Sequence, residues 1–227
     1  MRTRSSAMKT LHAKAKISGF TLVEVLAVIF VLFVLAALLL PMFARVKSGR
    51  MEPCMFNQHQ IAISFIMFAD DHSGKFPAQV SITNGGSFEI AASGSVSAHF
   101  QALAPYLGKD PNILICLSDK TRHAATNFSE LKNENVSYFL NLDATTTPAS
   151  ILTGDRHLEI DGKPITSGVF FQTTNLQLNW SDGFHGIHGK PWGYFSFGDG
   201  HAQLVRAQEL NSFLQSQPFT TNQFCFP

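Results

Sequence analysis

The stretch KISGFTLVE, Lys16–Glu24, joins a basic segment to a long apolar run and decides how the fold is built. From Phe20 to Phe43 the chain carries one formal charge, Glu24, and one proline, Pro41. An α-helix needs about 20 apolar residues to cross the hydrocarbon core of a bilayer. The run therefore predicts a single membrane-spanning helix.

Glu24 is the unusual residue of this run. A carboxylate placed in hydrocarbon costs about 2.5–3.5 kcal/mol on insertion scales. An ordinary membrane anchor gives no reason for an acid at this position. We therefore expect a positively charged group to neutralise Glu24.

Charge along the chain indicates its orientation. The first 19 residues contain five basic side chains and no acid, which predicts that this leader stays in the cytoplasm and that the rest is exported. The whole chain has 17 basic and 16 acidic residues, so without the leader the balance is 12 against 16. A net charge of −4 argues against nucleic acid as the main partner of the exported part.

The segment Gly19–Glu24 resembles the processing site of type IV pilins and of type II secretion pseudopilins. In that family, a membrane peptidase cuts after the glycine and methylates the new terminal amine. The resemblance implies cleavage between Gly19 and Phe20 and N-methylation of Phe20. It also implies that the Glu24 carboxylate pairs with the terminal amine of a neighbouring subunit. Pro41 falls where many pilins have a helix-weakening proline.

An ordinary signal peptide or signal anchor is the alternative. A secretory peptidase requires a small-x-small site after the apolar core. Ala36-Ala37-Leu38 offers only a poor one, and Pro41 follows closely. The prepilin interpretation accounts for Glu24 and is the one we prefer.

The apolar pattern continues beyond the membrane run. From Gln58 onward, apolar residues recur at spacings of three and four, which predicts an amphipathic helix. It should end near Asp71, with Gly74 as its C-terminal cap and Pro77 blocking continuation. One helix from about Phe20 to Asp71, bent at its prolines, is the expectation. A separate, shorter helix after a break at Pro53 is the alternative.

The remainder reads as a head of helices and antiparallel strands. We expect short helices at His99–Leu107 and Ala207–Gln215, a loop over 79–97 and an irregular tail from Pro218 to Pro227. Asp199-Gly200 indicates a hairpin. Strands are expected within Pro111–Asp119 and at Val136–Leu140, Ile151–Thr153, Val169–Gln172, Leu176–Trp180, Gly193–Phe197 and Ala202–Val205.

The expected fold is therefore α+β and pilin-like, with a long N-terminal helix packed on a small antiparallel sheet. Its parts are a basic leader, a transmembrane assembly helix, an amphipathic continuation and an extracytoplasmic head, at residues 1–19, 20–43, 44–72 and 73–227.

Fragments throughout the head resemble a branch of the pilin-like proteins that is abundant in planctomycete and verrucomicrobial genomes. That branch is described by a C-terminal H-x9-D-G element. Here ten residues separate His188 from Asp199, and Leu117 stands where proline is usual. The matching fragments are Cys54–Ile61, Phe68–Pro77, Pro105–Gly108, Cys116–Asp119, Ser137–Asn141, Gly154–Arg156, His188-Gly189 and Phe197–His201.

The three cysteines, Cys54, Cys116 and Cys225, all follow the apolar run. An odd number allows at most one intramolecular disulfide. Cys54–Cys116 would tie the helix to the head, and Cys116–Cys225 would hold the C-terminal segment. Three reduced, partly buried thiols are the remaining alternative. We favour Cys54–Cys116.

Polar residues around the hairpin raise the question of a metal. Asp182 and Asp199, with backbone carbonyls, could hold calcium, whereas histidines are poor calcium ligands. Asp-Gly also serves simply as a turn, and we prefer that interpretation. No common catalytic or nucleotide-binding motif is present, so we expect no catalytic residue, no enzyme activity and no cofactor.

The sequence thus favours a structural subunit of a type II secretion pseudopilus or type IV pilus. It would lie in the inner membrane with a cytoplasmic leader and a periplasmic head before it joins a filament. The partners implied by the resemblance are a prepilin peptidase and methyltransferase, sibling subunits and an inner-membrane assembly platform. A membrane-tethered enzyme or glycan-binding module, with a pocket lined by Asp155, His185, His188 and Asp199, is the alternative.

Overall fold

The computed structural model describes residues 21–44, 52–173, 176–181, 185, 191–217 and 221–227. The chain divides into two compact units, Met1–Lys47 and Ser48–Pro227. The first unit contains one described helix, and the second is an α+β domain with antiparallel sheets.

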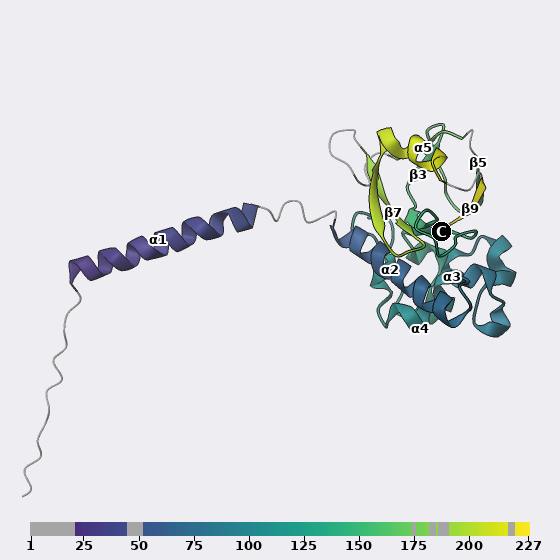
Figure 1. The fold of residues 1–227 in the computed structure, drawn as a ribbon, viewed down its shortest axis with the longest axis horizontal. Coiled ribbons are helices and arrows are strands. Elements are labelled where there is room, and N and C mark those ends of the chain that lie inside the picture. Colours follow the sequence, from purple (N-terminus) through teal and green to yellow (C-terminus); the bar gives the residue numbers. More distant parts are fainter. Residues whose placement is uncertain (1–20, 45–51, 174–175, 182–184, 186–190, 218–220) are drawn as a thin grey trace, which may run out of the picture. The chain divides into compact units, whose positions relative to one another are not determined.

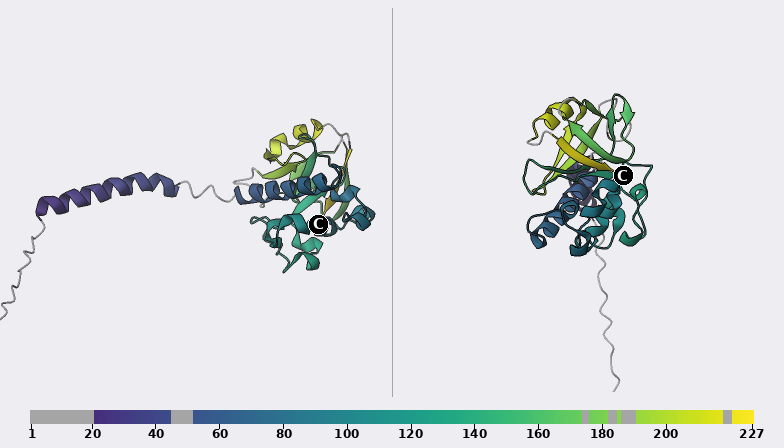
Figure 2. Two further views of the ribbon diagram at one scale, coloured as in Figure 1. Left: turned by 60° about the horizontal axis from the view of Figure 1, so that its bottom comes forward. Right: turned by 90° about the vertical axis from the view of Figure 1, so that its right-hand side faces the viewer.

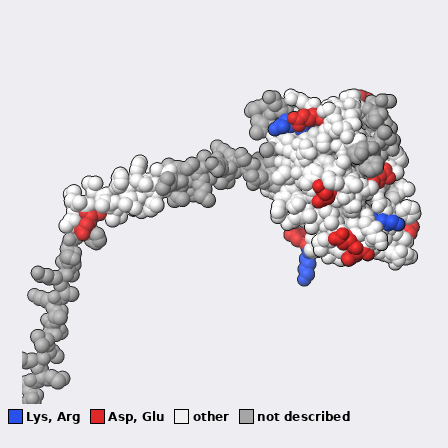
Figure 3. All heavy atoms as spheres, viewed as in Figure 1, with Lys and Arg blue, Asp and Glu red and all other residues white. Residues whose placement is uncertain are grey.

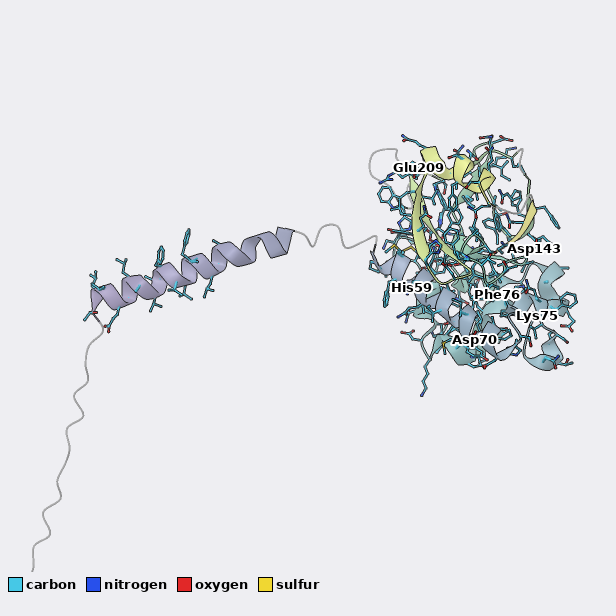
Figure 4. The ribbon with its side chains drawn as sticks, in the orientation of Figure 1. His59, Asp70, Lys75, Phe76, Asp143 and Glu209 are labelled. Atoms are coloured by element: carbon cyan, nitrogen blue, oxygen red, sulfur yellow. A yellow bond between two sulfur atoms is a disulfide. The ribbon has the colours of Figure 1, made fainter. Side chains whose placement is uncertain are left out.

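Helix α1, Leu22–Ala44, is the described part of the first unit (Figure 1). It continues through Pro41. Its large apolar side chains are exposed, and Figure 4 shows them projecting in several directions. Side chains of α1 are described only as far as Ala37. Over the described residues, no helix has both the length and the apolarity needed to cross a bilayer.

Helix α2, Glu52–Asp71, opens the second unit. Where we expected one helix from Phe20 to Asp71, the structure describes two helices, α1 and α2. Residues 45–51 between them are not among the described residues. Pro53 does not bend α2, because it lies in the first turn, where a missing backbone N–H costs nothing. The helix ends where predicted. Gly74 has a φ of +77°, and its N–H donates to Ala69 O at 2.8 Å.

Six antiparallel strands form the main sheet in the order β5-β9-β1-β2-β7-β8. The β7–β8 hairpin turns at Asp199-Gly200, as predicted. In sheet order these strands are Gly168–Thr173, Thr221–Phe226, Tyr138–Asn141, Ile151–Asp155, Trp192–Phe197 and Ala202–Arg206. A smaller sheet has the order β4-β3-β6, formed by Lys163–Pro164, Leu158–Ile160 and Leu178–Trp180.

The main sheet is buried on both faces. Along β1, Tyr138 and Leu140 join a core with α2, whereas Phe139 joins a second core with α5, Ala207–Gln215. This alternation follows from the two-residue period of a strand. Figures 1 and 2 show α2 and α5 on different sides of the sheet.

Short helices fill the edge of the α2 core. The predicted helix at His99–Leu107 is two helices, α3 at Val96–Ala102 and α4 at Ala104–Leu107, because Pro105 begins a new turn. The others are 3-10 turns: η2 Pro77–Gln79, η3 Ile82–Asn84, η4 Phe88–Ser93, η5 Pro111–Leu114, η6 Phe128–Glu130 and η7 Asn133–Asn135.

Two expectations about the head were wrong. The predicted strand within Pro111–Asp119 does not form. Asp110 accepts a hydrogen bond from Asn112 N at 2.9 Å and so caps η5 instead. The C-terminal segment is not irregular. Residues Thr221–Phe226 form β9, which pairs with both β1 and β5 and so lies inside the sheet.

Candidate functional site

Glu24 lies in the first turn of α1 and interacts with Thr21. Its Oε2 accepts hydrogen bonds from Thr21 N and Thr21 Oγ1, each at 2.8 Å. In return, Glu24 N donates to Thr21 Oγ1 at 3.3 Å. This reciprocal arrangement is a capping box, in which threonine and a glutamate three residues later satisfy the free backbone donors of a helix start.

The capping box adds a role for Glu24 that our sequence interpretation missed. The Thr-x-x-Glu spacing of residues 21–24 was the available signal. Both bonds from Thr21 end on Oε2, and the side chain is exposed, so a second donor can reach Oε1. Gly19 and Phe20, the predicted cleavage site, lie outside the described residues.

Several polar groups surround Asp155, at the end of β2. The Asp155 carboxylate is fully buried. Its Oδ1 accepts a hydrogen bond from Gln58 Nε2 of α2 at 3.1 Å, and its Oδ2 accepts one from Tyr194 N of β7 at 2.7 Å. His185 Nε2 lies 3.4 Å from the same Oδ2. We call Gln58, Asp155, His185 and Tyr194 the Asp155 cluster.

A disulfide adjoins the Asp155 cluster. It joins Cys54 of α2 to Cys116, which follows η5. The third cysteine, Cys225, is buried and free, and its burial raises the pKa of its thiol to about 11. His185 Nε2 lies 3.4 Å from Cys116 Sγ. Helix α2 is therefore joined covalently to the η5 segment at the point where Asp155 and His185 meet.

Asp119 and Arg156 form an ion pair on the same side of the domain. Arg156 Nε donates to Asp119 Oδ2 at 2.7 Å, and Arg156 Nη2 donates to Oδ1 at 3.1 Å. Burial raises the pKa of Asp119, but hydrogen bonds from Arg156 and Thr121 and the Arg156 charge outweigh it and lower that pKa to about 2. Burial, with the Arg156 charge, lowers the pKa of neighbouring His157 to about 3.

The other predicted site residues do not join this group. Asp199 accepts a hydrogen bond from His201 N at 3.1 Å in the β7–β8 turn, where Gly200 has a φ of +94°. His59, labelled in Figure 4, reaches this turn from α2 through a 2.5 Å contact between its Nδ1 and Gly200 O. Asp182, the other calcium candidate, lies outside the described residues.

The pocket that the enzyme alternative requires is formed only in part. Asp155 and His185 come together, but both are buried and Asp199 pairs with His201 elsewhere. His188 lies outside the described residues. Asp155 and His185 therefore act within the core and present no open surface to a substrate.

Hollows along α2 are lined by other residues. One, of about 440 Å³, is lined by the exposed side chains of Phe56, Ile63 and Met67 and, across from them, by Tyr106 and Ile113. A second, of about 450 Å³, lies near Pro53 and Leu117. We call the surface formed by these two hollows the α2 groove. Its lining is largely apolar, which suits a protein contact better than a catalytic centre.

No family model matches the chain, and no curated protein or solved structure matches it.

Proposed function

We propose that this chain is a structural subunit of a pilin-like filament, either a type II secretion pseudopilus or a type IV pilus. It is cut between Gly19 and Phe20, methylated on Phe20, and held by α1 first in the inner membrane and then in the filament. The observation that carries the proposal is α1, an apolar helix with one acid in its first turn, preceded by Gly19-Phe20.

The exposed apolar surface of α1 supports this role. Phe30 and Phe33 are 66% and 72% exposed, and the large apolar side chains from Leu22 to Leu35 are exposed with them. In Figure 3 the described part of α1 is white apart from acidic atoms at its start. Leaving such a side chain in water costs roughly 1.5–3 kcal/mol relative to burial. Lipid covers these side chains in the membrane, and the α1 helices of neighbouring subunits cover them in the filament.

Glu24 supplies the register of assembly. The capping box holds its carboxylate at the start of α1. A terminal amine of a neighbouring subunit is a cation of matching charge, and pairing lowers the cost of a carboxylate in an apolar surrounding. Because the box uses Thr21, which follows the cleavage point, it survives processing.

The second unit is suited to an extracytoplasmic compartment. Its Cys54–Cys116 disulfide is of the kind that persists outside the cytoplasm. The Asp119–Arg156 pair joins the segment after Cys116 to the end of β2, and the Asp155 cluster joins α2 to the end of β2. The α2 groove offers an apolar surface for neighbouring heads.

Mass spectrometry of the chain purified from its native host tests the proposal. We expect an N-terminal peptide that begins at N-methylated Phe20. Substitution of Gly19 by a bulky residue should block cleavage and leave the full-length chain in the membrane. Recovery of an unmethylated chain that still carries residues 1–19 would contradict the proposal.

A further inference from the structure

We propose that the reduced chain binds Zn²⁺ through Cys54, Cys116 and His185, with Asp155 as the fourth ligand, and that the Cys54–Cys116 disulfide and the metal exclude each other. The inference rests on the second unit alone and does not depend on the proposed function.

Three of the four donor groups, those of Cys54, Cys116 and His185, already have the spacing of a zinc site. The ligand atoms of Cys54, Cys116 and His185 all lie within 4.8 Å of one another. His185 Nε2 lies 3.4 Å from Cys116 Sγ and 3.4 Å from Asp155 Oδ2. Around a tetrahedral zinc ion with ordinary bond lengths, neighbouring ligand atoms lie about 3.3–3.8 Å apart. Cys54, Cys116 and His185 therefore need little movement to hold an ion once the disulfide opens. Asp155, in contact with His185, completes the site when its carboxylate moves toward the ion.

Burial and supporting contacts match those of a structural zinc site. Cys54, Cys116 and Asp155 are fully buried, and His185 is 4% exposed. Gln58 Nε2 and Tyr194 N fix the Asp155 carboxylate. The His185 ring lies parallel to Trp192 and edge-on to Tyr194, with centroids 6.4 and 5.6 Å away. Such contacts orient ligands and strengthen metal binding.

The donor types select the metal. Two thiolates and an imidazole are soft or borderline ligands that suit zinc, whereas calcium requires six to eight oxygen atoms. The ligands come from α2, the segment after η5, β2 and the segment between β6 and β7. A zinc ion would join α2 to the sheet at the same place as the disulfide does.

The exchange between the two forms balances. A disulfide oxidant takes two electrons from the Cys54 and Cys116 thiolates and two protons from solvent, and it leaves as two thiols. The Cys54–Cys116 bond forms, and Zn²⁺ is released because its two thiolate ligands no longer exist. A dithiol reductant reverses the exchange and is itself oxidised to a disulfide.

Metal analysis of the full-length chain in detergent, without oxygen, tests the site. The chain is reduced, loaded with zinc sulfate and dialysed, and zinc and free thiols are then counted. We expect about one zinc ion per reduced chain and less than a tenth of that after oxidation. Cobalt in place of zinc should give thiolate-to-cobalt absorption. Zinc absent from the reduced chain, or equal in both forms, would overturn the proposal.

Variants locate the ion. Cys54→Ser and His185→Ala should each abolish retention of zinc through dialysis, and Asp155→Asn should weaken binding about 10- to 100-fold. Cys225→Ser is the matched control, because this buried cysteine lies outside the cluster, and it should retain zinc. Equal loss of zinc in Cys225→Ser and Cys54→Ser would count against the assigned ligands.

Alkylation of the unaltered chain gives a readout that does not depend on variants folding. Zinc should protect Cys54 and Cys116 from a thiol reagent and leave the rate at Cys225 unchanged. Protection of all three thiols, or of none, would refute the site.

Discussion

Helices α1 and α2 differ in what surrounds their apolar side chains. In α2, Ile61, Phe65 and Phe68 are buried against the sheet and short helices, while the opposite face is mixed. In α1, the described apolar side chains are exposed on every side. A periodic apolar stripe needs cover on one face, whereas a helix that is apolar all round needs cover on every face.

The largest expected loss of stability comes from truncating a buried side chain of α2. It tests whether the packing of α2 stabilises the second unit. Phe65→Ala should lower the free energy of unfolding of the second unit by about 3–5 kcal/mol, because Phe65 packs against Phe76 and Phe100 with centroids 5.5 and 6.1 Å away. Urea denaturation in detergent, followed by tryptophan fluorescence, measures this loss.

Two matched controls sharpen that test. Phe56→Ala, on the exposed face of α2, and Phe33→Ala, in α1, should each change the same free energy by no more than about 0.5 kcal/mol. Equal losses in all three variants would mean that the distinction between the helices is wrong.

An intermediate effect concerns the polar contacts of the second unit. Arg156→Ala leaves the buried Asp119 carboxylate without its cation and should lower the free energy of unfolding by about 2–3 kcal/mol at neutral pH. Chemical denaturation of the unaltered chain and of Arg156→Ala at pH 7 measures the difference in their free energies of unfolding. A change below about 0.5 kcal/mol would show that solvent replaces the guanidinium.

The pH dependence of the same pair has a definite sign. Asp119 has a pKa of about 2 in the folded chain, below the roughly 3.9 of an unfolded aspartate. The pair therefore stabilises the folded state above about pH 4, and this contribution is lost as pH falls through about 2. Denaturation between pH 5 and 2 should show a flatter decline for Arg156→Ala than for the unaltered chain.

The smallest expected change in stability separates the two roles of Glu24. Thr21→Ala removes the cap and should destabilise the start of α1 by about 0.5–2 kcal/mol, whereas Glu24→Gln keeps the box and removes the charge. Helicity by circular dichroism measures the first effect, and filament yield in the host measures the second.

If Glu24 pairs with a neighbouring amine, Glu24→Gln should impair assembly as much as Glu24→Ala, while Thr21→Ala should assemble. Normal filaments from Glu24→Gln would leave capping as the sole function of this carboxylate.

Local signals in the sequence were sufficient for much of the fold. The end of α2 near Gly74, the hairpin at Asp199-Gly200 and helix α5 at Ala207–Gln215 all lie where predicted. Each is set by residues adjacent in sequence, through a cap, a turn or a helical repeat. The α+β class follows from these elements.

Contacts between distant residues were beyond such signals. Strand β9 is stabilised by partners in β1 and β5, and its own residues include Thr221, Asn222 and Gln223, which resemble a loop. The Asp155 cluster joins four parts of the chain, α2, β2, the segment between β6 and β7, and β7. The sequence grouped Asp155 with His185, but no spacing motif indicated Gln58 or Tyr194 as their partners. The capping box differs from these contacts, because its signal, threonine followed three residues later by glutamate, is local.

The place of β9 between β1 and β5 has a consequence for biosynthesis. The sheet cannot close until roughly 80 residues after β1 have left the ribosome. At 5–20 residues per second, the β1 edge waits about 4–16 s for its neighbour. An unpaired edge is a template for aggregation during that interval. If the second unit is exported as proposed, the same delay keeps the chain unfolded and able to pass through a channel that admits extended polypeptide.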